Sequence, residues 1–167
     1  MLLSLLFLLP TNSWELVGGS LTYHIIDGGA AQAFSNKLSP DGRLINNPIY
    51  GIQYVTESDS LYETIGIFSG DDSVGDPILG MKYSTGYKYN HWYLGLVLGA
   101  YEQSTMGFTN RGIQPFEFAQ IGDVGIVPLI GGEVNYRVNL SQSMYVKLNN
   151  LISPIITNTT ISLGYSF

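Results

Sequence analysis

Residues 157–167 (TNTTISLGYSF) constrain the fold of this chain more than any other segment. Large apolar residues alternate there with small or polar ones, namely Ile161, Leu163, Tyr165 and Phe167 with Thr160, Ser162, Gly164 and Ser166. Alternation at a period of two indicates a β-strand with one apolar and one polar face. An apolar face that ends in aromatic residues, opposite small polar residues, is typical of a barrel strand that faces lipid. The segment therefore predicts a barrel with an apolar outer surface and a polar lumen.

Composition favours a membrane barrel over a soluble domain or a helical membrane protein. Only 12% of the 167 residues are charged, whereas an average soluble domain has about 25%. Aromatic residues reach 13% and include 12 Tyr, which suits the aromatic girdles at the two interfaces of a membrane barrel. No apolar run approaches the roughly 20 residues that a membrane helix needs. The length is that of a single domain.

Charge and cysteine content exclude several classes of partner and cofactor. The net charge is −6 and Lys and Arg form no cluster, which argues against binding of nucleic acid. The chain has no Cys, so neither disulfides nor thiolate metal sites are available. We therefore expect no nucleic-acid partner, no cofactor and no bound metal ion, and we expect a monomer.

Eight segments have the length and alternation of strands that cross a bilayer at a tilt. They are Val17–Asp27, Pro48–Glu57, Leu61–Gly70, Pro77–Tyr87, His91–Tyr101, Val124–Arg137, Gln142–Ile152 and Thr157–Phe167. The connections alternate between longer and tight ones, as the extracellular loops and periplasmic turns of outer-membrane barrels do. The sequence thus predicts an all-β fold, an eight-stranded antiparallel transmembrane β-barrel of the outer-membrane type. Its lumen has room for side chains or one small ligand, which excludes a wide pore.

The two ends of the chain indicate the compartment. Met1–Pro10 is an apolar run followed by Thr11-Asn12-Ser13, which predicts a signal peptide over residues 1–13 and a barrel domain over residues 14–167. The alternative is a buried first strand or short helix. The terminal Phe167 after an alternating strand resembles the sorting signal of bacterial outer-membrane barrels. We expect an integral, multi-pass protein of the outer membrane of a Gram-negative cell.

One group of residues has the chemistry for catalysis at the outward end of the barrel. His24 lies near the outward end of the first strand, and Asp72 and Ser73 lie in the outward loop between the third and fourth strands. With Tyr23 and Ile25 facing lipid, alternation turns His24 into the lumen. A His can act as general base, a Ser as nucleophile and an Asp as the group that orients the imidazole. The alternatives are an ordinary Asp-Asp-Ser turn and a structural His.

A set of short motifs, in order over about residues 20–167, resembles the lipid A palmitoyltransferases (PagP-type) of Gram-negative outer membranes. The motifs are Thr22-Tyr23-His24, Asn47-Pro48, Asp72-Ser73, Pro77-Ile78 with Gly80, Leu94-Gly95-Leu96 with Gly99, Pro128-Leu129 before Gly131-Gly132, and Pro154. The resemblance implies an acyltransferase that moves an acyl chain from a membrane phospholipid donor to lipid A or a related glycolipid.

Site residues follow from the same resemblance. It assigns the catalytic roles to His24, Asp72 and Ser73. It also places Pro48 and Pro154 at points of lateral lipid access, and Gly80 and Lys82 at an apolar well that holds the acyl chain. Lys82 stands where the family has the small residue of the floor of the well.

Charged residues predicted to face the lumen favour an alternative function. By alternation Lys82 points into the lumen, as do Glu133, Arg137 and Lys147, and buried charges require a paired network. Such a network would fill space that an acyl chain needs. The alternative is a non-catalytic small outer-membrane barrel with a structural, adhesion or interaction role, in which the loops Gly28–Asn47 and Glu102–Asp123 bind partners. A soluble lipocalin-like barrel is a third hypothesis, and it requires an apolar lumen. Convergence of the three site residues over an apolar well distinguishes the first hypothesis from the second.

Overall fold

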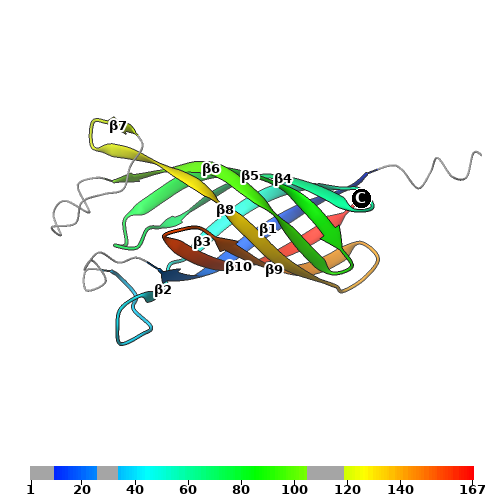
Figure 1. Ribbon diagram of the computed structural model, residues 1–167, viewed down its shortest axis with the longest axis horizontal. Coiled ribbons are helices and arrows are strands. Elements are labelled where there is room, and N and C mark those ends of the chain that lie inside the picture. Colours follow the sequence, from blue (N-terminus) through cyan, green and yellow to red (C-terminus); the bar gives the residue numbers. More distant parts are fainter. Residues whose placement is uncertain (1–9, 26–33, 105–118) are drawn as a thin grey trace, which may run out of the picture.

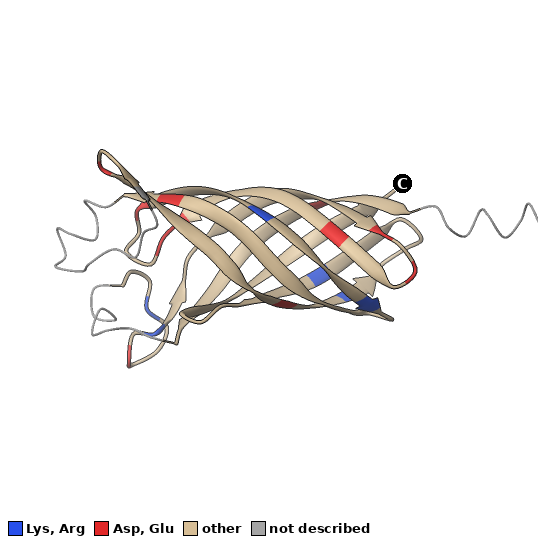
Figure 2. Cartoon of the chain, turned by 45° about the horizontal axis from the view of Figure 1, so that its top comes forward, with Lys and Arg blue, Asp and Glu red and all other residues tan. Residues whose placement is uncertain are grey.

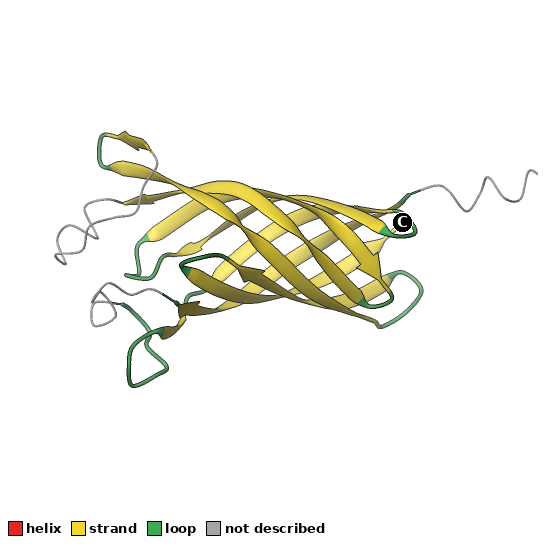
Figure 3. Ribbon diagram, in the orientation of Figure 1, coloured by secondary structure: helices red, strands yellow, loops and turns green. Residues whose placement is uncertain are grey.

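The computed structural model describes residues 10–25, 34–104 and 119–167, and all of its strands belong to one antiparallel sheet (Figure 3). The strands are β1 (Thr11–His24), β2 (Leu44–Asn46), β3 (Ile49–Glu57), β4 (Leu61–Asp71), β5 (Pro77–Tyr89), β6 (Trp92–Ser104), β7 (Ala119–Ile121), β8 (Val124–Asn139), β9 (Met144–Ile152) and β10 (Ile156–Ser166). Within the described ranges no helix is long and apolar enough to cross a bilayer.

Eight of these strands form the wall of a closed barrel (Figure 1). Their order is β1, β3, β4, β5, β6, β8, β9 and β10, and β10 closes the wall by pairing with β1 from Ser13 opposite Ser166 to His24 opposite Ile156. The short strand β2 continues the pairing of β3 along β1, and β7 pairs with the start of β8. The predicted fold class is confirmed.

The two long connections lie at one end of the barrel, as the sequence predicts, although the turn of residues 153–155 between β9 and β10 at that end is as short as those at the other end. Tight turns join β3 to β4, β5 to β6 and β8 to β9 at one end of the barrel, where the C-terminus also lies (Figure 1). The long connections lie at the opposite end, which is therefore the outer end. Parts of the two loops predicted to carry recognition, residues 28–33 and 105–118, lie outside the described residues.

The first strand begins earlier than the alternation pattern predicts. β1 starts at Thr11 rather than Val17, because Thr11–Ser13 pair with Val55–Glu57 of β3. The signal peptide over residues 1–13 stays a prediction, since residues 1–9 lie outside the described part of the chain. Its last three residues are, however, part of the barrel wall.

The outer surface of the barrel is apolar over most of its height. Leu16 and Leu96 are 62% and 68% exposed on this surface, and most of the strand length carries no charge (Figure 2). Aromatic residues gather near the end with the tight turns, namely Trp14, Tyr87, Tyr89, Trp92, Tyr136, Tyr165 and Phe167. Only lipid favours such a surface, and a closed barrel leaves no backbone edge unpaired in lipid. The chain is thus an integral barrel of the Gram-negative outer membrane.

Tyrosine rings fill the periplasmic half of the lumen over glycines of nearby strands. A Cβ on Gly164 would lie 2.1 Å from Tyr145 Cζ, and one on Gly95 would lie 2.3 Å from the Tyr62 hydroxyl oxygen. Both tyrosines are fully buried. The small residues on the inner face therefore make room for large side chains from nearby strands, so this half of the lumen is packed.

Charged groups between these rings form a paired network, the polar core, which confirms the inward orientation predicted for Glu133, Arg137 and Lys147. Its residues are Glu15, Gln53, Glu57, Tyr62, Tyr93, Glu133, Arg137, Tyr145 and Lys147. The Lys147 ammonium lies 2.5 Å from Glu15 Oε1, and the Arg137 guanidinium 2.9 Å from Glu57 Oε1. Tyr62 donates a hydrogen bond of 2.6 Å to Glu133 Oε1. Partners of this kind offset the cost of burying charge.

We expect the buried pair of Glu15 and Lys147 to be essential for stability. Glu15→Gln should lower the free energy of unfolding by about 3–5 kcal/mol, because it leaves the Lys147 charge buried and unpaired. The double variant with Lys147→Met should recover much of that loss. Equilibrium urea unfolding in lipid vesicles measures both changes, with the exposed Glu63→Gln as control. A Glu15→Gln variant as stable as the wild type would contradict the role of this pair.

Candidate functional site

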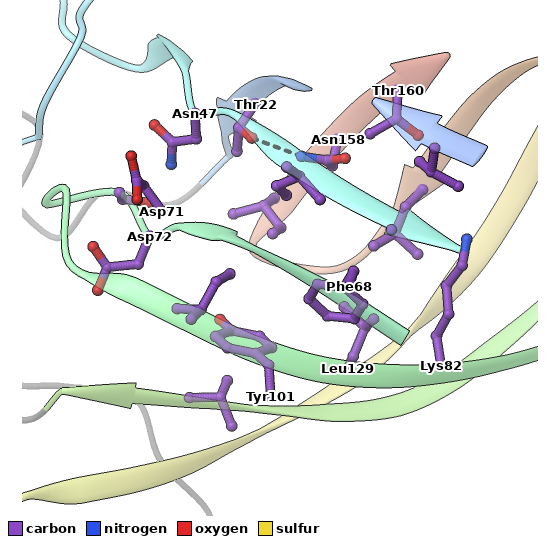
Figure 4. Close-up of a pocket in the computed structure, with 18 of the residues that line it drawn as sticks. Thr22, Asn47, Phe68, Asp71, Asp72, Lys82, Tyr101, Leu129, Asn158 and Thr160 are labelled. Atoms are coloured by element: carbon purple, nitrogen blue, oxygen red, sulfur yellow. Dashed lines mark hydrogen bonds between the residues drawn. The ribbon is translucent and has the colours of Figure 1, made fainter. Parts of the chain in front are cut away.

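The outer half of the lumen contains a cavity of about 300 Å³, which we call the well (Figure 4). Most of its wall is apolar and comes from Val17, Ile49, Phe68, Ile78, Val97, Tyr101, Val127, Leu129, Leu151 and Ile156. His24, Asp72 and Ser73 lie at its outer end. The three residues singled out from the sequence therefore converge over an apolar well, which is the arrangement expected of the first functional hypothesis.

His24 and Ser73 are in direct contact although they are 49 positions apart in the chain. His24 Nε2 lies 2.7 Å from Ser73 Oγ. His24 ends β1 and is 9% exposed, and Ser73 belongs to the turn between β4 and β5. A hydrogen bond between an imidazole nitrogen and a serine hydroxyl is the geometry in which the imidazole acts as base and activates the hydroxyl.

A β-bulge in β1 turns His24 into the lumen. The pairing of β1 with β10 shifts by one residue between Gly18 and Leu21, and Gly19 has a φ of +71°. In an unbroken strand, Glu15 and His24 would face opposite sides because their positions differ by nine, an odd number. The extra residue changes the phase, so both side chains point inward. Gly18-Gly19 is the sequence signal that could have predicted this bulge.

Asp72 does not contact the imidazole, in contrast to the orienting role expected from the sequence. Its Oδ1 accepts hydrogen bonds of 2.9 Å from the backbone N–H groups of Val74 and Asp76. Its Oδ2 is buried without a hydrogen-bond partner. Burial raises the pKa of the Asp72 carboxyl, against the lowering effect of the two N–H donors. The carboxyl therefore shapes the turn of residues 72–76 and so positions Ser73.

Phe34 is a part of the site that the sequence analysis missed. Its ring stacks on the His24 imidazole with 4.1 Å between ring centroids and 33° between planes, and it lines the well. The neighbouring Ser35 N–H donates a hydrogen bond of 2.8 Å to the Ser73 carbonyl oxygen. This segment therefore joins the end of β1, which holds His24, to the turn that holds Ser73. No local pattern around Phe34 predicts a contact across such a sequence distance.

The remaining predicted site residues lie around the well. Pro48 lies in the break between β2 and β3, and its carbonyl oxygen accepts a hydrogen bond from the Asp71 N–H. Pro154 is exposed in the turn between β9 and β10. Gly80 faces inward behind the wall of the well, where a Cβ would lie 2.4 Å from Phe68 Cζ. Lys82 lines the well itself.

The barrel wall beside the well is irregular at two places. On β1, no pairing is recorded for Gly19 and Ser20 on the side of β2 and β3, since the pairs run from Gly18–Tyr50 directly to Leu21–Asn46. On β8, residues 127–131 have no described partner on the side away from β6, because pairing with β9 begins at Gly132. Both interruptions lie in the outer half, next to Pro48 and Pro154.

The polar groups of the site are suited to acyl chemistry without a metal ligand set. Among the described residues, no group of three or more His, Cys, Asp or Glu is placed to hold a metal ion. A base, a hydroxyl and an apolar cavity are the elements needed to bind an acyl ester and attack its carbonyl carbon.

Comparison with protein-family models gives no match, and neither does comparison with curated proteins. Three solved structures with similar folds are small barrels. Ail, the attachment invasion locus protein of Yersinia pestis, is 13% identical over 94% of this chain and 99% of its own, with a TM-score of 0.48. A de novo designed transmembrane β-barrel is 13% identical over 92% and 95%, with a TM-score of 0.45. The N-terminal β-barrel domain of Pseudomonas aeruginosa OprF is 11% identical over 95% and 99%, with a TM-score of 0.41. No statement about activity follows from likenesses this distant.

The role of Asp72 in shaping the turn can be tested by two substitutions. Asp72→Ala should increase amide hydrogen exchange at Val74 and Asp76 by roughly tenfold or more, because both N–H groups lose their acceptor. Asp72→Asn retains an acceptor oxygen and buries no charge, so the amides of Val74 and Asp76 should stay protected from exchange. Exchange measured by NMR on the barrel in detergent micelles distinguishes the two. Unchanged protection in Asp72→Ala would show that the carboxyl does not hold the turn.

Proposed function

We propose that this protein is an outer-membrane acyltransferase similar to the lipid A palmitoyltransferases. It would move an acyl chain from a membrane phospholipid to lipid A or a related glycolipid, acting as a monomer. The observation that carries the proposal is the contact of 2.7 Å between His24 Nε2 and Ser73 Oγ at the mouth of the apolar well. An ester carbonyl held there, with its acyl chain in the well, lies within reach of both groups.

The chemistry follows from the two groups in contact. Ser73 Oγ attacks the ester carbonyl carbon while its proton passes to His24 Nε2. The bond to the lysophospholipid oxygen then breaks, and the imidazolium returns the proton to that oxygen. A hydroxyl of the acceptor next gives its proton to His24 and attacks the acyl-serine. Collapse of this second intermediate transfers the acyl group and returns a proton to Ser73.

Access from lipid is consistent with the irregular wall. The interruptions at Gly19-Ser20 and at residues 127–131 lie in the outer half of the barrel, beside the well. Local pairing is weakest where ladder hydrogen bonds are missing. These two places are therefore the expected routes for a donor acyl chain and an acceptor between membrane and well.

A second candidate function is a non-catalytic barrel that binds partners at the cell surface. Two observations favour it: the polar core fills the periplasmic half of the lumen, and β7 with the start of β8 extends the wall at the outer end (Figure 1). Loops on such a rigid scaffold can carry recognition. In that case the contact of His24 with Ser73 is structural.

Substitution of the two contacting residues distinguishes the candidates. Ser73→Ala and His24→Ala should each lower acyl transfer by at least about 100-fold, because general base catalysis alone contributes roughly 10²–10⁴-fold. The assay uses refolded protein in detergent with a labelled phosphatidylcholine donor and lipid A acceptor, and mass spectrometry of the products.

Matched controls are Ser84→Ala, which removes a buried hydroxyl without a partner away from the well, and His91→Ala in a periplasmic turn. Both should retain activity. Folded wild-type protein that neither transfers nor hydrolyses the acyl chain would favour the non-catalytic barrel.

A further inference from the structure

The floor of the well is polar, although most of its wall is apolar. Gln53, Lys82 and Glu133 all line the well, and Gln53 and Glu133 also belong to the polar core beneath it. Figure 4 shows Lys82 at the opposite end of the cavity from Asp71 and Asp72, with Phe68 and Leu129 nearby. Lys82 lies four residues along β5 from Ile78, or roughly 13 Å of strand. A ligand that fills the well therefore ends against an ammonium group.

Lys82 is the one inward cation of the described strands that makes no ion pair. Lys147 pairs with Glu15, and Arg137 and Lys88 both pair with Glu57. Lys82 makes no hydrogen bond or ion pair with any described residue. Glu133 acts on it only through space, since Glu133 Oε1 accepts the Tyr62 hydroxyl.

Glu133 is the one carboxylate of the polar core without an ion pair, since Glu15 pairs with Lys147, and Glu57 pairs with Arg137 and with Lys88, whose side chain is 27% exposed. Glu133 and Glu15 therefore offset the charge of Lys82 only from a distance. An ammonium that faces an apolar cavity without a direct ion pair is costly. A carboxylate supplied by a ligand would give Lys82 that partner and reduce this cost.

We propose that the well binds an acyl chain that ends in a carboxylate, with the carboxylate on Lys82 and the ester at His24 and Ser73. This proposal deepens the acyl-transfer function above and rests on it for the position of the ester. The volume of 300 Å³ is at the lower end of the ~300–1,000 Å³ range of small-molecule sites, which favours a short chain. The substrate class is thus a lipid ester of a dicarboxylic acid, such as an azelaoyl phospholipid.

Binding can be tested without catalysis. The Ser73→Ala variant in detergent micelles is titrated with monomethyl azelate and with methyl nonanoate, which has the same number of carbons but ends in a methyl group. Chemical shifts of inward-facing residues report binding. The azelate should bind roughly 10- to 100-fold more tightly, since a hydrogen bond between charged partners has about that effect on affinity.

Substitution of Lys82 provides the second measurement. Added to Ser73→Ala, Lys82→Met should remove the preference for azelate, and Lys82→Arg should retain it because the charge is kept. Equal affinities for the two esters with Lys82 present would overturn the proposal, as would a preference that survives in Lys82→Met. The preference for azelate could depend on Lys82 while the wild type turns over neither ester. That result would support the binding mode proposed here and would overturn only the proposed acyl transfer.

Discussion

The width of the lumen is the constraint on which the rest of this structure depends. A closed barrel of eight strands has an interior that side chains can just fill, so each part of it is either packed or open to one small ligand. Here the division is uneven along the barrel axis. Paired charges and tyrosine rings close the periplasmic half around Glu15 and Lys147, and apolar side chains leave a cavity of about 300 Å³ in the outer half. The packed half forms the base on which the well stands.

Irregular backbone holds His24 and Ser73 at the mouth of that cavity. The bulge at Gly18–Leu21 turns His24 inward, and the Asp72 carboxyl organises the turn that presents Ser73. Phe34 then packs on the imidazole from a third segment. Irregular backbone is tolerated at membrane depth where it borders protein or a cavity. Strand pairing is also interrupted in the wall beside the well, at Gly19-Ser20 and at residues 127–131, and these are the places where we propose that lipid enters.

Local alternation was sufficient to predict the architecture, because the side chains of a membrane barrel must separate into a lipid face and a lumen face. It correctly predicted a strand over residues 157–167 and the inward orientation of Glu133, Arg137 and Lys147. It could not place the start of β1, since Thr11–Ser13 are fixed by pairing with β3 rather than by their own pattern. It also could not show that Asp72 bonds the backbone of its own turn, or that Phe34 reaches His24. Both depend on loop geometry that no period in the sequence encodes.

The central claim is that His24 activates Ser73 at the mouth of the well. The most direct test is reaction of the folded barrel with an alkyl fluorophosphonate, followed by intact-mass analysis and peptide mapping. The account predicts a single adduct on Ser73 that is lost in His24→Ala and retained in His91→Ala. An unmodified Ser73 in folded protein, or equal labelling with and without His24, would contradict it.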